Sequence, residues 1–576
     1  HLLGDVAEVN QADVDSDAYY KSGDYIGKLG VERSYEKVLR GEKGMRILLR
    51  DVHGRTKGHY MDGKYDTQAQ PGRNLTLGID YGTQELAERL LEGKYGAIVA
   101  IEPSTGEILA MASAPTYDPR DMVGRDRGKA MTAMMRDERR PLLNRAIAGT
   151  YPPGSTFKIS QALLGLQEGS ITPSVACPCA HGFNYKGLHV GCHGHASPIN
   201  LVPAIGTSCN SYFCWNLLRL LSNRGKYGSV QAAMTRWKDQ VVHMGFGYKL
   251  GIDLPGERRG MIPNAAYYDK AYKRSWNALT VISIGIGQGE VTATPLQIAN
   301  LAATVANRGH YFVPHVARRI QGERLDTTST RPHRTLVARR WYDYAVAGMR
   351  RSVLAGTCRG ADFPGGEVCG KTGTAQNRGH DHSAFMGFAP MNKPRIAVCV
   401  YVENGGFGAD FAVPIGSLIM EQYLNGKLSA GSRARAESFR LRHINYGSHA
   451  RSSAQSRLSS RRLGAPHLPG APHLRLVQRV RREPHLRPAK PSLLRHPRRQ
   501  TVGVDRLRLG AGRYDLDVRR PLFRHAGRPV LLVDDGAAAR HAVHRPRHQG
   551  FALLDLAGPR IVAAGRVCQV RHGTHG

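Results

Sequence analysis

The pattern of hydrophobic and polar positions between residues 75 and 113 predicts a strand, a helix and then a β-hairpin. Residues 75–77 have the composition of a strand, and residues 84–91 carry apolar side chains at helical spacing. The continuous apolar run 96–101 is typical of a buried strand. A Pro-Ser-Thr-Gly turn at 103–106 then returns the chain into residues 107–113, the predicted hairpin partner.

A second group of strands is predicted near the other end of the same domain. Residues 383–388 and 396–402 flank a turn at 390–394, and the long stretch before them is helical or irregular. Strands from both ends of a domain with helices between them favour an α+β layer architecture over alternating βαβ units. Residues 1–70 mix polar turns with short helical patterns and carry no obvious chemistry.

The basic charge of the chain is concentrated in its last part. The net charge is +35, and residues 451–576 contribute 26 Lys and Arg against 7 Asp and Glu, with 25 of the 26 being Arg. One interpretation is a basic tail for anionic polymers. We favour the other, out-of-frame translation beyond the natural end, because a selected basic tail normally mixes Lys with Arg. Nucleic-acid binding ranks last, since the tail lacks interleaved aromatic residues.

No run of eighteen apolar residues occurs in the sequence, and the chain begins at His1 without a charged leader. We therefore expect any membrane anchor to lie in a segment that this sequence does not include.

The strongest local motif is Ser155-x-x-Lys158, which follows a Pro-Pro-Gly turn and opens a helical run. Residues at i and i+3 share a helix face, so Lys158 is expected within reach of the Ser155 hydroxyl. An alcohol is a poor nucleophile without a neighbouring base, and a desolvated Lys has a pKa low enough for that role. By itself the motif is weak, because a helix cap followed by a solvated Lys has the same pattern.

Two further motifs follow in order and strengthen the first: Ser208-Cys209-Asn210 and Lys371-Thr372-Gly373-Thr374. Ser208 is expected to relay a proton between Lys158 and the leaving group, and Asn210 to hold a peptide carbonyl of the substrate.

The third motif predicts the surface on which the substrate lies. Lys371 supplies a cation, and Gly373 lets a substrate backbone lie along an edge strand. The N–H of Thr374 would pair with that of Ser155 as an oxyanion hole.

With all three motifs present, the chain resembles the penicillin-binding protein and serine β-lactamase superfamily, and in particular the monofunctional class B transpeptidases of the penicillin-binding protein 2 type. Further stretches that resemble this family are residues 50–55, 100–106, 251–257, 285–295 and 403–406. The resemblance covers roughly residues 1–450.

The resemblance implies a truncated pedestal domain at 1–70 and a transpeptidase domain at 71–446. The composition marks residues 447–576 as a third part, a tail that is disordered or out of frame. The transpeptidase fold is a five-stranded antiparallel sheet flanked by helices. Ser155 would attack the D-Ala-D-Ala carbonyl of one peptidoglycan stem peptide and pass the acyl group to an amine of another, and β-lactams would acylate it. The resemblance also implies a periplasmic domain of an inner-membrane protein and an elongation glycosyltransferase as partner, with no nucleic acid.

Other functions use the same machinery. A D,D-carboxypeptidase or β-lactamase passes the acyl group to water, and a β-lactam sensor or scaffold does not turn over. The pedestal-like segment argues against a lactamase, and intact Ser155, Lys158 and Lys371 argue against an inert scaffold.

A group of thiols and imidazoles lies between the first two motifs and could form a Cys₃His zinc shell. From the resemblance the ligands are assigned as Cys177, Cys192, His195 and Cys209, with Cys179 and His193 as the nearest rivals. Disulfides or isolated buried thiols are the alternatives. A closed shell would make the zinc structural, clamping the segment that carries Ser208 and Asn210.

Overall fold

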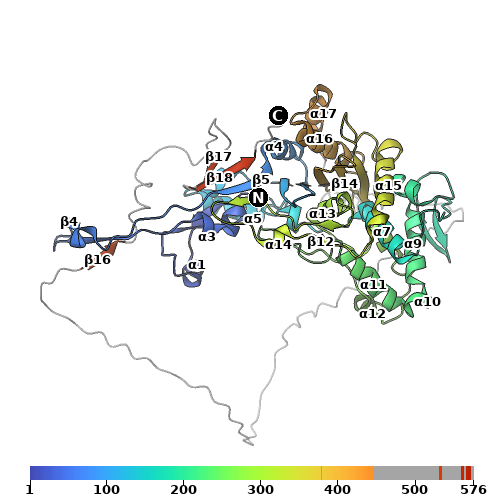
Figure 1. Ribbon diagram of the computed structural model, residues 1–576, viewed down its shortest axis with the longest axis horizontal. Coiled ribbons are helices and arrows are strands. Elements are labelled where there is room, and N and C mark those ends of the chain that lie inside the picture. Colours follow the sequence, from blue (N-terminus) through green and yellow to red (C-terminus); the bar gives the residue numbers. More distant parts are fainter. Residues whose placement is uncertain (378, 443, 445–530, 535–559, 564–565, 572–576) are drawn as a thin grey trace, which may run out of the picture. The chain divides into compact units, whose positions relative to one another are not determined.

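The computed structural model describes residues 1–377, 379–442, 444, 531–534, 560–563 and 566–571 (Figure 1). The chain divides into two compact units, residues 1–49, 56–446 and 531–576 in the first, and 50–55 with 447–530 in the second. The features below belong to the first unit. Among the described residues, none of the helices combines the length and apolar character that crossing a bilayer requires.

The centre of the first unit is a five-stranded antiparallel sheet in the order β13-β14-β15-β6-β7. Its strands are β6 (Gly96–Ile101), β7 (Ile108–Ala114), β13 (Cys369–Ala375), β14 (His382–Ala389) and β15 (Ile396–Val402). Strand β6 is buried along its whole length, which explains its continuous apolar run. The predicted α+β class and the pairing of strands from the two ends of the domain are confirmed.

Helices cover both faces of this sheet (Figure 1). One apolar core packs β6, β14 and β15 against α13 (Pro295–Ala306) and continues to α7 (Lys158–Glu168). The other lies under α4 (Tyr81–Leu90) and α16 (Ala412–Asn425). Helix α13 is buried on all sides, which is typical of a helix that is apolar all round. Its first turn is closed by a capping box formed by the side chains of Thr294 and Gln297.

The remaining helices and 3₁₀ turns are α1 (Gln11–Ser16), α2 (Gly30–Ser34), α3 (Glu36–Leu39), η1 (Tyr60–Gly63), η2 (Pro119–Met122), α5 (Arg127–Arg136), α6 (Arg145–Ala148), η3 (Gly154–Phe157), α8 (Leu201–Gly206), α9 (Asn210–Leu221), α10 (Arg224–Tyr227), α11 (Val230–Val242), α12 (Ala265–Ala271), η4 (Ile282–Ile286), α14 (Thr327–Thr330), η5 (Arg339–Trp341), α15 (Tyr342–Ala355) and α17 (Ala430–Leu441). The remaining strands are β1 (Val6–Glu8), β2 (Tyr25–Gly27), β3 (Arg46–Arg50), β4 (Thr56–His59), β5 (Leu75–Asp80), β8 (Gly182–Tyr185), β9 (Leu188–Gly191), β10 (His310–Tyr311), β11 (Ala317–Ile320), β12 (His333–Arg334), β16 (Leu531–Asp534), β17 (Arg560–Ala563) and β18 (Arg566–Arg571).

Most of the predicted tail, residues 447–576, lies outside the described residues, so its interpretation stays a prediction, as do the domain boundaries. Within the tail, β16 pairs with β3, and β18 pairs with β5.

The N-terminal segment contacts the rest of the unit through a partly buried polar junction. The hydroxyl of Tyr35 donates to Oδ2 of Asp253 over 2.5 Å. The same carboxylate accepts the backbone N–H groups of Val316 and Ala317 over 2.7 and 2.9 Å. One side chain of the 251–257 motif therefore joins the N-terminal segment to the start of β11.

The C-terminal end of α7 is held by a carboxylate. Glu168 accepts hydrogen bonds from Lys226, Tyr227, Arg236 and Gln240 at 2.7–2.8 Å. Burial alone would raise the pKa of Glu168, but these donors outweigh it and lower the pKa to about 2.

We expect Glu168→Gln to lower the free energy of unfolding by about 2–3 kcal/mol, because it removes the charge on which several donors converge. Denaturant unfolding of the purified chain measures this loss. Asp343→Asn is the control, since that carboxylate pairs with Arg308 but is 75% exposed, and should cost less than about 0.5 kcal/mol. Equal losses in the two variants would show that Glu168 does not anchor the helix.

Candidate active site

Ser155 lies in the 3₁₀ turn η3, which continues directly into α7 at Lys158. The turn is fixed before the serine, because Tyr151 and Ala293 exchange two backbone hydrogen bonds of 2.8–2.9 Å and the N–H of Gly154 donates to Gly287. Gly154 has φ +55°, and a Cβ there would lie 2.8 Å from the carbonyl oxygen of Thr374. A glycine at this position therefore lets the turn that holds Ser155 pack against the third motif.

The Lys158 amine is completely buried and surrounded by acceptors of the second motif. Its Nζ donates to the carbonyl oxygen of Ser208 and to Oδ1 of Asn210, each over 2.6 Å, and lies 3.3 Å from Oγ of Ser208. Burial lowers the pKa of Lys158 to about 8. A proton acceptor thus becomes available one turn after Ser155 at moderately alkaline pH.

The Ser208 hydroxyl joins the two lysines of the predicted site. The Nζ of Lys371 donates to Oγ of Ser208 over 2.8 Å and to the carbonyl oxygen of Thr372 over 3.0 Å. Ser208 reaches this position with φ +59°, a conformation that costs a non-glycine residue free energy and is typical of functional sites. Burial, and then the charge of Lys158, lower the pKa of Lys371 to about 7.

The third motif lies on β13, an edge strand of the central sheet as far as the described residues extend. A Cβ on Gly373 would lie 3.0 Å from Cγ2 of Thr156 and 3.1 Å from the carbonyl oxygen of Pro153. The backbone of Thr374 adjoins Gly154, one residue before Ser155. The structure therefore brings all three motifs together, and β13 has an edge for an extended peptide.

The predicted roles of individual site residues stay predictions, but two contacts refine them. One N–H of the Asn210 side-chain amide donates to the carbonyl oxygen of Gly191 over 2.7 Å while its oxygen accepts from Lys158, so this side chain is fixed before any substrate arrives.

Sequence reasoning missed two residues that contact the third motif. Nε2 of Gln288 donates to the carbonyl oxygen of Thr374 over 3.3 Å, and the hydroxyl of Thr357 lies 2.7 Å from that of Thr372. Gln288 lies in the 285–295 stretch that resembles the family, so its position in the sequence could have marked it as a site residue. Thr357 lies in none of the motifs or stretches that resemble the family, so nothing in the sequence was a reason to select it.

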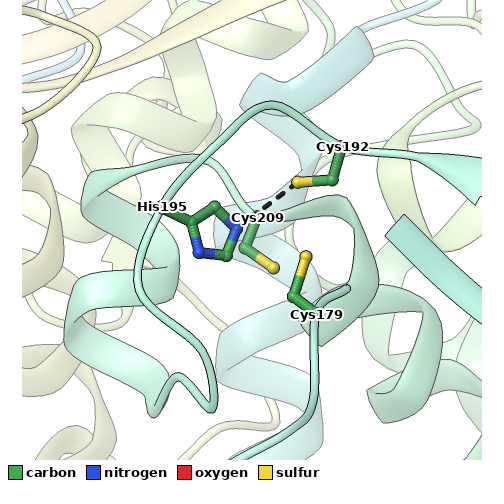
Figure 2. Close-up of side chains that lie close together, drawn as sticks. All are labelled: Cys179, Cys192, His195 and Cys209. Atoms are coloured by element: carbon green, nitrogen blue, oxygen red, sulfur yellow. Dashed lines mark hydrogen bonds between the residues drawn. The ribbon is translucent and has the colours of Figure 1, made fainter. Parts of the chain in front are cut away.

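Beside the second motif, Cys179, Cys192, His195 and Cys209 converge on one point (Figure 2), with their donor atoms within 4.8 Å of one another. Three sulfur atoms and one imidazole nitrogen form the donor set that Zn²⁺ prefers, and the spacing suits a tetrahedral shell. The cluster is tied to the active site because the backbone N–H of Asn210 donates to Sγ of Cys192 over 3.2 Å.

The prediction that Cys177 belongs to this cluster is wrong, and its rival Cys179 takes the place. Cys177 forms a two-bond bridge with Ile199 and its thiol is buried near Arg219, with its pKa raised by burial. Cys179 lies two residues further, beside the 192–195 loop, where its N–H donates to Ser197. The other rival, His193, contacts the carbonyl oxygen of Thr207 instead.

The pKa values of two thiols in the cluster are shifted in opposite directions. Hydrogen bonds from Cys209, the Asn210 N–H and His195 lower the pKa of Cys192 to about 3, while the pKa of Cys209 is raised. The eight cysteines within residues 1–442 are free thiols. A lowered thiol pKa favours the deprotonated form that a bound cation requires.

Comparisons with known proteins identify the family of this chain. Residues 96–421 match the penicillin binding protein transpeptidase domain, and residues 1–77 match the penicillin-binding protein dimerisation domain. The chain therefore belongs to the penicillin-binding protein transpeptidase family, and within it to the penicillin-binding protein 2 type. The fold and family predicted from the sequence are confirmed.

Individual relatives support the same placement. The peptidoglycan D,D-transpeptidase MrdA of Acinetobacter baumannii is 36% identical over 446 residues, which cover 72% of this chain and 64% of that protein. The structure of Pseudomonas aeruginosa PBP2 in complex with WCK 5153 has a TM-score of 0.63 and 34% identity, covering 75% of this chain and 90% of that one. A structure of a peptidoglycan synthase complex that coordinates polymerization and crosslinking has a TM-score of 0.64 and 30% identity, covering 74% of each chain.

We expect the rate of serine acylation to rise as the pH passes through about 8, because Lys158, whose pKa burial lowers to about 8, must lose its own proton before it can accept that of Ser155. Stopped-flow measurement of acylation by a chromogenic cephalosporin at a series of pH values gives this rise in rate. A lysine of ordinary pKa would place the rise near pH 10 instead, and that profile would contradict the lowered value.

Proposed function

We propose that this chain is the catalytic part of a peptidoglycan D,D-transpeptidase that cross-links stem peptides during cell elongation. The observation that carries the proposal is the Ser208 hydroxyl, which hydrogen-bonds to Lys371 and lies 3.3 Å from the Lys158 amine, beside the turn that holds Ser155. MrdA relatives with that activity, and the β13 edge, support the peptide substrate.

The first half-reaction forms a bond between Oγ of Ser155 and the penultimate D-Ala carbonyl carbon. Lys158 accepts the serine proton, and the N–H groups of Ser155 and Thr374 stabilise the oxyanion. The C–N bond to the terminal D-Ala then breaks, with Ser208 delivering a proton to the departing amine. A β-lactam would undergo the same attack, but its leaving group stays attached.

In the second half-reaction an amine of a neighbouring stem peptide attacks the acyl ester and displaces Ser155. The proposed substrate is part of the cell wall, which supports a location in the periplasm at the inner membrane. A membrane glycosyltransferase is the proposed partner, because a structural relative belongs to a complex that couples polymerization with crosslinking.

We expect fluorescent penicillin to label the wild-type chain covalently, and Ser155→Ala to lose labelling completely because no other residue replaces the nucleophile. In-gel fluorescence after denaturation measures this. The matched control is Ser160→Ala, which removes a buried hydroxyl of α7 that donates to the carbonyl oxygen of Phe157, the N-cap of this helix. This variant should keep the label. Unlabelled wild type would refute the serine mechanism. Mass spectrometry of products from a donor and acceptor stem peptide separates cross-linking from the hydrolysis of a carboxypeptidase.

We further propose that Cys179, Cys192, His195 and Cys209 hold a structural Zn²⁺. A closed Cys₃His shell leaves no open position for water, so the ion would fix the segment from Ser208 to Asn210 and take no part in the reaction.

We expect about one equivalent of zinc in the wild-type chain and less than about 0.2 equivalent in Cys192→Ser, because a four-ligand shell loses most of its affinity with one thiolate. Metal analysis by mass spectrometry after gel filtration measures both. Cys177→Ser should keep its zinc, since that thiol lies outside the cluster. Wild type with no metal, or a Cys177→Ser variant that loses it, would count against this ligand set.

A further inference from the structure

Thr357 lies in the loop after α15 and connects the second and third motifs. Its backbone N–H donates to the carbonyl oxygen of Gly206 over 3.2 Å, just before the segment that carries Ser208. Its hydroxyl lies 2.7 Å from that of Thr372 on β13. The preceding Gly356 allows this close approach, because a Cβ there would lie 2.0 Å from the Gly206 oxygen.

Three hydroxyls form a chain that ends at the third motif. Oγ of Ser352, a fully buried residue of α15, lies 3.3 Å from Oγ1 of Thr357, which in turn contacts Oγ1 of Thr372. Each hydroxyl has one proton to donate and two lone pairs to accept. When Ser352 donates to Thr357 and Thr357 donates to Thr372, the proton of Thr372 is left for another acceptor.

That acceptor has a defined chemistry if the proposed function holds, on which this inference rests. A D-Ala-D-Ala donor ends in a free carboxylate one residue beyond the attacked carbonyl. In the proposed mechanism the N–H of Thr374 binds the oxyanion. Thr372 precedes Thr374 by two residues, so its side chain lies on the same face of β13, about 7 Å away along the strand. A carboxylate lying there needs hydroxyl donors, and hydrogen bonds to a charged acceptor are stronger than neutral ones.

The geometry points to Thr357 as a positioning residue that turns the Thr372 hydroxyl into a donor for the terminal carboxylate of the donor peptide or of a β-lactam. Thr357 acts through Thr372 and also keeps the Gly206–Ser208 segment beside β13. It therefore sets the preference of the enzyme for acyl donors that carry a negative charge at this end.

The test compares acylation of the full chain by benzylpenicillin and by its methyl ester, which lacks the carboxylate charge. Thr357→Val removes the hydroxyl and keeps the shape, and should lower the second-order rate constant for benzylpenicillin about tenfold or more. The rate with the ester, measured on the same samples by intact-protein mass spectrometry, should change less than about twofold. Thr357→Ser restores the hydroxyl and should recover most of the lost rate.

A double-mutant cycle separates positioning from general damage. Thr372→Val should be impaired with benzylpenicillin, and adding Thr357→Val should cost little more, because both changes interrupt one chain. Thr335→Val is the matched control. It also removes a threonine hydroxyl that lies 2.7 Å from another hydroxyl, here that of Tyr342 at the opposite end of α15. This variant should leave both rates unchanged.

Equal losses with the two probes, additive losses in the cycle, or a serine variant as slow as the valine variant would each overturn the assignment of Thr357. A wild-type chain that reacts with neither probe would instead refute the proposed function itself. Melting temperatures of all variants identify any that lose rate through unfolding.

Discussion

The constraint on which the rest of the structure depends is the burial of two amines beside one hydroxyl. Lys158 and Lys371 come from a helix and from an edge strand, and Ser208 lies between them with its backbone in a left-handed conformation. Removing two ammonium groups from water is costly, so each amine needs acceptors on several sides and both lose protons more easily than free lysine. Much of the surrounding architecture supplies those acceptors.

Two rigid parts hold the amines in place. The buried α13 and the paired strands β13–β14–β15 fix the side of Lys371, while α7, held at its far end by Glu168, fixes the side of Lys158. The 206–210 segment bridges them and is itself tied to α15 through Thr357 and to the thiol cluster through the Asn210 N–H. The site thus depends on contacts well outside the three motifs.

Features that depend on local pattern could be predicted from the sequence. The continuous apolar runs in the sequence predicted β6 and the strands within 383–402 as buried strands. The three motifs identified segments that the structure brings together. The choice of Cys179 over Cys177 could not, because spacing alone does not reveal that Cys177 pairs with Ile199. Nor could the Thr357–Thr372 contact or the junction of Tyr35 with Asp253, since both are made by tertiary packing between segments without a shared pattern.

The triplet Ser208-Cys209-Asn210 has a consequence for how this enzyme can vary. Its first and last residues bind the Lys158 amine, and the middle residue is both the N-cap of α9 and a member of the thiol cluster. A change that shifts this backbone would disturb the Lys158 contacts, the cluster and the helix at the same time. One short segment therefore couples the environment of a buried amine, a helix start and a cysteine cluster, so it tolerates backbone change less than segments that serve one of these alone.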